Sequence, residues 1–245
     1  MNQILVTGKS GRMGQAVIAA VNANPDTELA STHDAGEDLT AAIAKADTAI
    51  DFTIHSFTGE LLEAAKKAGT RLVIGTTGHS EEEKHAILEA SKSLPIVFAP
   101  NFSVGVNTLF WLTRHAARIL TQDRFDIEVT EMHHRHKIDA PSGTARRLLE
   151  ILNEETGTSY EDDVKHGRVG LTGARTQREI GMHTLRGGDV VGDHTVMFAA
   201  DGERVELTHK ASSRMTFAAG AARAAVWLAG KPAGLYDMQD VLGLQ

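Results

Sequence analysis

Short apolar runs alternate with amphipathic stretches through the first part of the chain. The apolar runs predict five strands, at Ile4–Thr7, Glu28–His33, Ala49–Thr53, Arg71–Ile74 and Ile96–Ala99. The stretches between them predict helices at Ala16–Val21, Leu39–Ala46, Leu61–Ala68 and Glu81–Lys92. Because strands and helices alternate at this spacing, we expect an α/β fold with a Rossmann-like, doubly wound parallel sheet.

The pattern changes after residue 103. Helices are expected at Asn107–Leu120 and Ala145–Asn153, a strand at Phe125–Met132, and irregular structure at Gly157–Gly173. Three further strands joined by glycine-rich turns are expected at Ile180–Arg186, Asp193–Ala200 and Arg204–Lys210. These strands predict a second α+β domain whose mixed sheet is mostly antiparallel. The alanine-rich helix expected at Phe217–Leu228 is suited to pack back onto the first domain.

These patterns divide the chain into two domains. Residues 1–103 and 213–245 are expected to form a dinucleotide-binding domain, and residues 104–212 a substrate-binding and oligomerisation domain. A length of 245 residues is sufficient for two such cores.

Composition narrows the possible functions. The net charge of −7 argues against broad nucleic-acid binding, so an anionic ligand needs a local basic cluster. The chain has no cysteine, which excludes disulfides, thiolate catalysis and cysteine-ligated metals. The first residues enter an apolar strand directly, and no stretch approaches the roughly 20 apolar residues of a membrane span. We therefore expect a cytoplasmic protein that does not associate with membranes.

A glycine-rich turn separates the first predicted strand from the first predicted helix. Its glycines are Gly8, Gly11 and Gly14, a G-x-x-G-x-x-G spacing, and Asp34 ends the second strand. In this context the turn predicts a site for a dinucleotide pyrophosphate, and Asp34 is placed to accept hydrogen bonds from the adenosine ribose. The alternative is a tight structural turn without a ligand.

The choice between NADH and NADPH stays open on these residues. Asp34 would repel a ribose 2′-phosphate, whereas Lys9 and Arg12 would attract one. Ala35 stands where an arginine would favour the phosphate, so the sequence favours NADH or the use of both cofactors.

Two further loops follow the fourth and fifth predicted strands. They are Gly75–Gly78 and Ala99–Phe102, at strand ends where doubly wound sheets bind ligands. Their small residues would admit the nicotinamide ribose, and their threonine and asparagine side chains offer hydrogen bonds. Each loop alone is also compatible with ordinary turn chemistry.

The segment His133–Thr144 carries the most informative chemistry. Its first five residues, His133–Lys137, can all bear positive charge in an otherwise acidic protein. A histidine there can serve as a general acid, with a lysine nearby to supply charge or a second proton. Gly143 and Thr144 follow at a predicted helix start, where backbone N–H groups can hold a carboxylate.

The residues of this segment allow two other interpretations. His134 and His136 point to one face of a strand and could share a metal, but Arg135 and Lys137 would oppose a divalent cation. A solvated surface run is the second alternative, although such runs usually consist of lysine and glutamate. We expect no metal.

The segment resembles the signature of the 4-hydroxy-tetrahydrodipicolinate reductase family. Similar blocks occur in order at the glycine turn and at Gly75–Gly78, Pro100–Asn107 and Thr208–Phe217. The resemblance covers nearly the whole chain. It implies NAD(P)H-dependent reduction of a cyclic, imine-containing dicarboxylate in diaminopimelate and lysine biosynthesis, by a homotetramer.

The resemblance also implies a role for individual residues. His133 would be the general acid and Lys137 the second catalytic group, while His134, Gly143 and Thr144 would bind the substrate. NADH, NADPH or both would be held by three loops and one acidic residue: Gly8, Lys9, Ser10, Gly11, Arg12, Met13, Asp34, Gly75, Thr76, Thr77, Ala99, Pro100, Asn101 and Phe102.

Two other classes of function share the cofactor turn. A dehydrogenase of another small carboxylic acid would not need both the basic segment and the Ser142–Thr144 turn. A non-catalytic sensor of NAD(H) would bind the cofactor without turning over a dicarboxylate.

Overall fold

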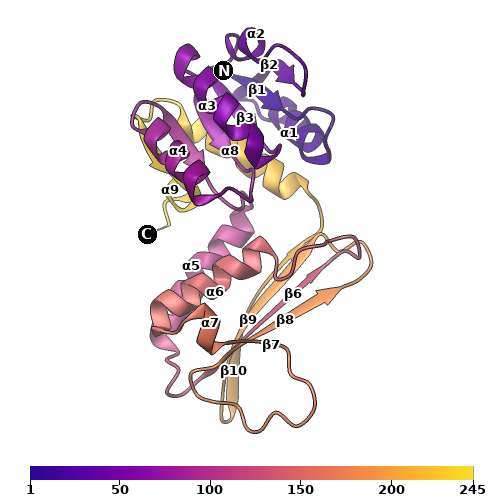
Figure 1. Cartoon of the computed structure of the whole chain (residues 1–245), viewed down its shortest axis with the longest axis vertical. Coiled ribbons are helices and arrows are strands. Elements are labelled where there is room, and N and C mark those ends of the chain that lie inside the picture. The colour runs from indigo at the N-terminus through magenta and orange to yellow at the C-terminus, as the bar shows by residue number, and fades with distance from the viewer. Residues whose placement is uncertain (245) are drawn as a thin grey trace. The chain divides into compact units, whose positions relative to one another are not determined.

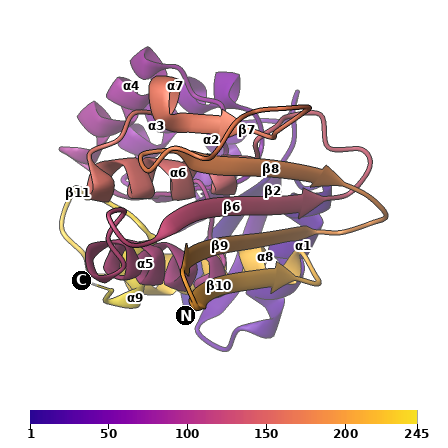
Figure 2. The same cartoon turned by 90° about the horizontal axis from the view of Figure 1, so that it is seen from below.

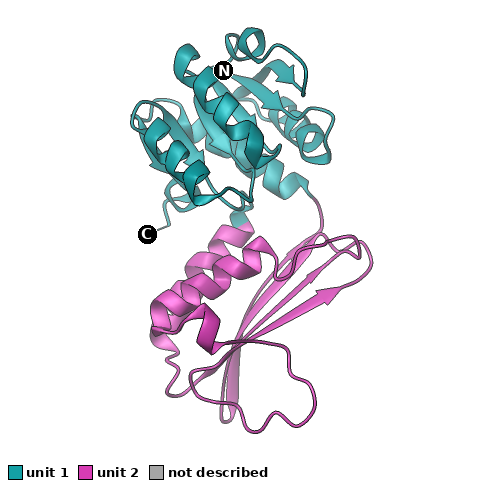
Figure 3. Ribbon diagram, viewed as in Figure 1, with its two compact units in different colours: residues 1–104, 214–245 teal, residues 105–213 magenta. Residues whose placement is uncertain are grey.

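The fold was analysed in a computed structural model that describes residues 1–244. The chain divides into two compact units, residues 1–104 with 214–245 and residues 105–213 (Figure 3). Within residues 1–244 no helix has both the length and the apolar character that a membrane crossing requires.

The first unit is built on a six-stranded sheet in which every pairing is parallel, as predicted (Figure 1). The strands, in their order across the sheet, are β11 (Gly234–Tyr236), β5 (Pro95–Phe98), β4 (Arg71–Ile74), β3 (Thr48–Asp51), β1 (Asn2–Thr7) and β2 (Thr27–His33). The chain proceeds from β1 to one side for β2 and to the other for β3. The switch point, where such sheets bind ligands, therefore lies between β1 and β3.

Alternating strand residues build a core on each face of this sheet. Ile4 and Val6 lie in one buried cluster with residues of α1, α8 and α9, whereas Leu5 lies in another with residues of α2, α3 and α4. A strand exposes successive side chains to opposite faces, so both faces need helices to cover them. The helices are α1 (Arg12–Ala23), α2 (Leu39–Ile43), α3 (Thr58–Ala68), α4 (Glu81–Ser91), α8 (Met215–Leu228) and α9 (Met238–Leu242).

The second unit contains a five-stranded mixed sheet. Its order is β10 (Glu203–Ala211), β9 (Gly192–Ala200), β6 (Asp126–His133), β8 (Ile180–Arg186) and β7 (Val164–His166). β10, β9 and β6 pair antiparallel, as expected, whereas β8 and β7 add parallel pairings at the other edge. The helices of this unit are α5 (Val104–Ile119), α6 (Gly143–Thr156) and α7 (Tyr160–Asp163).

Only one face of the second sheet contributes to its apolar core. Ile127 and Val129 of β6 and Val196 and Phe198 of β9 pack in one cluster with side chains of α5 and α6. Figure 2 looks onto the sheet with these two helices behind it. The opposite face carries partly exposed residues such as Thr130 and Met197.

Several short elements differ from the prediction. The stretch expected to be irregular contains α7 and β7, and the last residues form β11 and α9, which were not predicted. These elements span three to five residues, too few for a hydrophobic period to become visible. The strand expected to reach Thr53 ends at Asp51.

Candidate active site

The glycine turn after β1 has the backbone that its sequence predicts. Gly8 adopts φ +67°, a conformation that L side chains rarely take, and its N–H donates to the carbonyl of His33 over 2.8 Å. A side chain at Gly14 would run into the carbonyl oxygen of Gly8. Gly11 is the N-cap of α1 and brings no side-chain hydrogen bond to it. The first amides of α1 thus keep their capacity to bind a phosphate.

A buried carboxylate joins the three strand ends at the switch point. Asp51, the last residue of β3, accepts hydrogen bonds from the hydroxyls of Thr7 at 2.6 Å, Thr53 at 2.7 Å and Thr76 at 2.5 Å. Thr7 is the last residue of β1, whereas Thr53 and Thr76 lie just after β3 and β4. Sequence reasoning missed Asp51, because only the fold brings its three partners together.

Asp34 lies directly after β2, as predicted for a ribose-binding acid. Its carboxylate accepts from the backbone N–H of Ser10 at 3.1 Å, and its own N–H donates to Glu37 at 2.9 Å. The other oxygen of Glu37 forms an ion pair with Lys9. The hydrogen bond with Lys9 is the main cause that lowers the pKa of Glu37. Glu37 was not predicted; it adds a second carboxylate beside Asp34.

The remaining two predicted cofactor loops share a cluster of aromatic rings. A side chain at Gly75 would overlap the ring of Phe52, which packs edge-on against Phe102 with ring centroids 5.5 Å apart. The carbonyl of Phe102 in turn lies where a side chain at Gly220 would stand. The loops after β4 and β5 are therefore held close to the end of β3, at one edge of the sheet.

His133, the predicted general acid, ends β6 in the second unit. Its Nδ1 lies 2.5 Å from a carboxylate oxygen of Glu131, which is fully buried. Arg186 donates from both terminal nitrogens to the two oxygens of Glu131, each over 3.0 Å. Burial alone would raise the pKa of Glu131, but its hydrogen bonds with His133 and Arg186 outweigh burial and lower that pKa to about 2.

Lys137 is held by a neighbouring carboxylate. Its Nζ lies 2.8 Å from Asp139, whose backbone carbonyl accepts from Arg186 over 2.6 Å. Burial opposes ionisation of Asp139, yet the hydrogen bond with Lys137 leaves its pKa below the ordinary value. One arginine thus contacts both the partner of His133 and the loop that carries Lys137.

A second histidine lies against His133. The ring of His194 is 5.2 Å from that of His133, and its Nε2 is 3.0 Å from the hydroxyl of Ser142. Only 3% of His194 is exposed, and desolvation by burial lowers its pKa to about 3. His194 is therefore neutral near pH 7, so it adds no second positive charge next to His133. Sequence reasoning did not select it.

The predicted helix start lies beside these residues. Ser142 is the N-cap of α6; its hydroxyl accepts from the N–H of Ala145 at 3.2 Å, and its own N–H donates to Glu131 at 3.2 Å. Gly143 and Thr144 are the first two residues of α6 and lie at its N-terminal end. The rest of the basic segment lies close by, with the rings of His134 and His136 6.3 Å apart. In residues 1–244 no group of three or more potential ligands is arranged for a metal ion.

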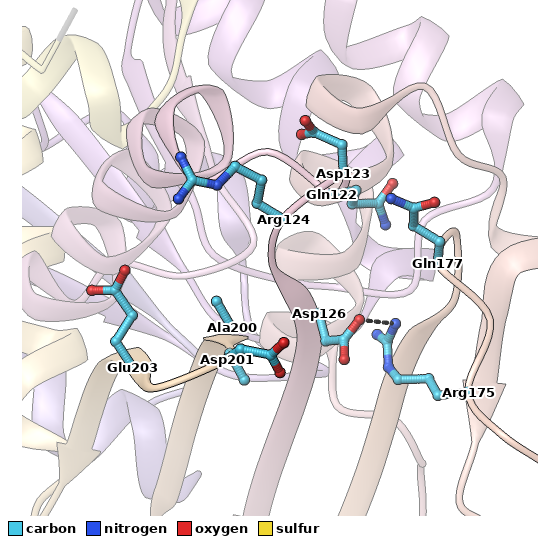
Figure 4. Close-up of a pocket in the computed structure, with 10 residues that line it drawn as sticks. Gln122, Asp123, Arg124, Asp126, Arg175, Gln177, Ala200, Asp201 and Glu203 are labelled. Carbon is cyan, nitrogen blue, oxygen red and sulfur yellow. Dashed lines mark hydrogen bonds and ion pairs between the residues drawn. The ribbon is translucent and has the colours of Figure 1, made fainter.

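A polar pocket of about 590 Å³ lies away from these residues (Figure 4). It opens where β6 begins and around the turn between β9 and β10, whereas His133 ends β6. An ion pair of 2.9 Å between Asp126 and Arg175 crosses it. None of the predicted site residues lines this pocket, so it is not the candidate active site.

A glycine turn at the switch point of a parallel sheet, together with a second unit that carries His133 against a buried carboxylate and a basic segment, is typical of one class of protein. The protein is a Rossmann-type oxidoreductase that uses NAD(P)H. Models of the dihydrodipicolinate reductase N-terminus and C-terminus match residues 2–102 and 105–242, so the chain belongs to the dihydrodipicolinate reductase family.

Individual relatives agree with this assignment over the full length. The chain is 66% identical to the 4-hydroxy-tetrahydrodipicolinate reductase of Akkermansia muciniphila, covering 100% of this chain and 99% of the relative. It is 48% identical to the enzyme of the same name from Hahella chejuensis, with 100% of both chains covered. A dipicolinate-bound dihydrodipicolinate reductase from Paenisporosarcina sp. TG-14 shares the fold, with a TM-score of 0.77 at 24% identity over 98% of each chain.

Proposed function

We propose that this protein reduces 4-hydroxy-tetrahydrodipicolinate to tetrahydrodipicolinate with NAD(P)H, in the cytoplasmic synthesis of diaminopimelate and lysine. The observation that carries the proposal is the buried Glu131 beneath His133, at the head of a basic segment and beside the start of α6. A dicarboxylate substrate needs positive charge and helix amides for its carboxylates, and a proton donor for the reduced ring. The names of the relatives identify the same substrate.

The first unit would hold the cofactor. The glycines of the turn leave room for the pyrophosphate at the start of α1, Asp34 would accept from the ribose, and the loops 75–77 and 99–102 would line the nicotinamide end. When bound, the cofactor supplies a hydride to the conjugated ring.

The second unit would bind the substrate and move the proton. His134, Gly143 and Thr144 would hold carboxylate groups, His133 would donate a proton from Nε2, and Lys137 would assist. Conversion of the substrate to the product adds one hydride and one proton and releases one water molecule, so atoms and charges balance.

The surroundings of Asp34 favour NADH over NADPH. Glu37 pairs with Lys9 and so neutralises the lysine that would otherwise attract a 2′-phosphate. Two carboxylates then lie near the adenosine ribose, where a phosphate would be repelled. The ion pair is partly exposed, so we expect a preference and not exclusive use of NADH.

The second unit also offers a surface for assembly into a homotetramer. Its sheet has one face outside the apolar core, and the loop before β8 exposes Val169 to 94% and Leu171 to 106% of their reference areas. Large apolar side chains exposed to this extent in a loop are typical of a covered interface.

The test follows nicotinamide absorbance while the protein receives NADH or NADPH and the freshly made condensation product of pyruvate and aspartate semialdehyde. We expect rapid, substrate-dependent oxidation of the cofactor. His133→Gln should lower kcat by about 100-fold or more while substrate affinity changes little, since a general acid typically contributes 10²–10⁴-fold. Tight cofactor binding without any turnover by the unmodified protein would instead favour an NAD(H) sensor.

A further inference from the structure

Glu131 interrupts the apolar pattern of its own strand. The inward positions of β6 are Ile127, Val129, Glu131 and His133, and the first two lie in the apolar core of the second unit. A fully buried carboxylate is costly unless it is paired, and an apolar side chain would serve packing equally well. The presence of Glu131 at this position therefore calls for a reason beyond packing.

Both oxygens of Glu131 are used by donors. One accepts from Arg186 at 3.0 Å and from the N–H of Ser142 at 3.2 Å; the other accepts from Arg186 at 3.0 Å and from His133 Nδ1 at 2.5 Å. Because an ionised carboxylate accepts and never donates, Nδ1 of His133 must carry a hydrogen. Nε2 is then the ring atom that can exchange a proton.

The backbone leaves the space beside Nε2 of His133 open. A Cβ at Gly192, the first residue of β9, would lie 3.0 Å from Nε2 of His133. The glycine leaves Nε2 uncovered on that side, while Glu131 fixes the other side of the ring.

Arg186 extends the network to the second predicted catalytic group. It balances the charge of Glu131, and its contact with the Asp139 carbonyl joins the strand to the loop whose carboxylate holds Lys137. The contacts run from His133 through Glu131, Arg186 and Asp139 to Lys137 without a gap.

We propose that Glu131 and Arg186 are the positioning residues of this active site: Glu131 sets the tautomer of His133, and Arg186 holds Glu131 and the Lys137 loop in one arrangement. The inference rests on the proposed function of His133. Neither residue need touch the substrate or the cofactor to act, as the aspartate of a serine-protease triad orients its histidine.

The decisive variant is Glu131→Gln. Arg186 and the N–H of Ser142 both donate at one of the two oxygen positions, so the single carbonyl oxygen of the new amide takes that position and the amide NH₂ faces His133. Nδ1 must then accept, which moves the hydrogen to Nε2. We expect kcat to fall about 100-fold or more, with KM for both substrates within about threefold.

A comparison with Glu131→Asp separates positioning from packing. Aspartate leaves a larger gap but keeps the charge, so a role in packing alone would make it the more damaging change. We expect the opposite order, with a higher kcat for Glu131→Asp than for Glu131→Gln. Glu155→Gln is the matched control, because Glu155 also pairs with arginines but lies near the far end of α6, and its kcat should be unchanged.

The tautomer is read directly by ¹⁵N NMR of labelled histidine, without any need for turnover. The unmodified protein should show His133 with its hydrogen on Nδ1, and Glu131→Gln should show it on Nε2. Equal kcat in Glu131→Gln and the unmodified protein, or an unchanged tautomer, would overturn the inference. If the unmodified protein shows the expected tautomer but no reductase activity, the proposed function fails and the inference about the network stands.

Discussion

His194 provides a stability test of the site that does not depend on turnover. Its ring is almost fully buried against His133, and the groups that face it are Glu131, His133, His209 and Lys137. Burial is the largest cause that lowers its pKa, to about 3 from 6.5. The replacement His194→Gln keeps a hydrogen-bonding group for Ser142 but cannot titrate.

The folded and unfolded states bind different numbers of protons, and this difference sets the direction in which stability changes with pH. The folded pKa lies below the unfolded one, so below about pH 6.5 the unfolded chain binds a proton that the folded protein does not. The free energy of unfolding therefore falls with decreasing pH, from about pH 6.5 to about pH 3. Between about pH 7.5 and about pH 5 the contribution of His194 amounts to about 2 kcal/mol, since only the unfolded state titrates there.

The assay is urea unfolding at several pH values in that interval. Replacing Trp227 of the first unit by phenylalanine leaves Trp111 of α5 as the only tryptophan, so fluorescence then follows the second unit. In this background the His194→Gln protein should lose about 2 kcal/mol less stability than its parent between the two pH values. Other histidines whose pKa is lowered by desolvation, such as His79 and His209, contribute to the pH dependence of both proteins and cancel in the comparison. Equal pH dependence with equal m-values would refute the neutral, buried state of His194.

Two further substitutions test the cofactor and proton sites. Glu37→Gln removes a carboxylate beside Asp34 and releases Lys9 from its ion pair. The ratio of kcat/KM for NADPH to kcat/KM for NADH should therefore rise about five- to tenfold in steady-state assays. An unchanged ratio would show that Glu37 and Lys9 do not act on the 2′ position of the cofactor. Gly192→Ala places a methyl group 3.0 Å from Nε2 of His133, and kcat should fall about tenfold or more while NADH affinity is kept. Gly59→Ala, where the added methyl meets nothing within 4 Å, is its control, and equal kcat in the two alanine variants would contradict the argument.

The hydrophobic pattern predicted the elements whose packing it controls. Every strand and α-helix of the first unit up to β5 was predicted, because each buries an alternating or helical set of side chains. β11 and α9 were missed since they are short and are stabilised by their neighbours: β11 adds to the edge of β5, and α9 packs through Met238 and Val241. Tertiary contacts, not local pattern, define such elements.

The parts of the candidate site that consist of consecutive residues could be predicted from the sequence. The glycine turn and the basic segment stand out in the sequence, and the structure brings His133, Lys137 and the start of α6 to one end of the second unit. Glu131, Arg186 and His194 could not be selected in this way. They are separated by up to 63 positions and meet only through the pairing of β6 with β8 and β9.

Strand β6 shows why residue type alone would not have identified them. It carries two glutamates with partners of the same residue types: Glu131 contacts His133 and Arg186, and Glu128 contacts His183 and two arginines of the loop before β8. Burial opposes the ionisation of both glutamates, but hydrogen bonds with their histidine and arginine partners lower the pKa of each glutamate to about 2. Their positions differ by an odd number, so they lie on opposite faces of the sheet. Glu128 fastens a loop on the face outside the core, whereas Glu131 lies on the face that holds His133. The register of one strand therefore decides which of two similar networks contacts His133, the proposed proton donor.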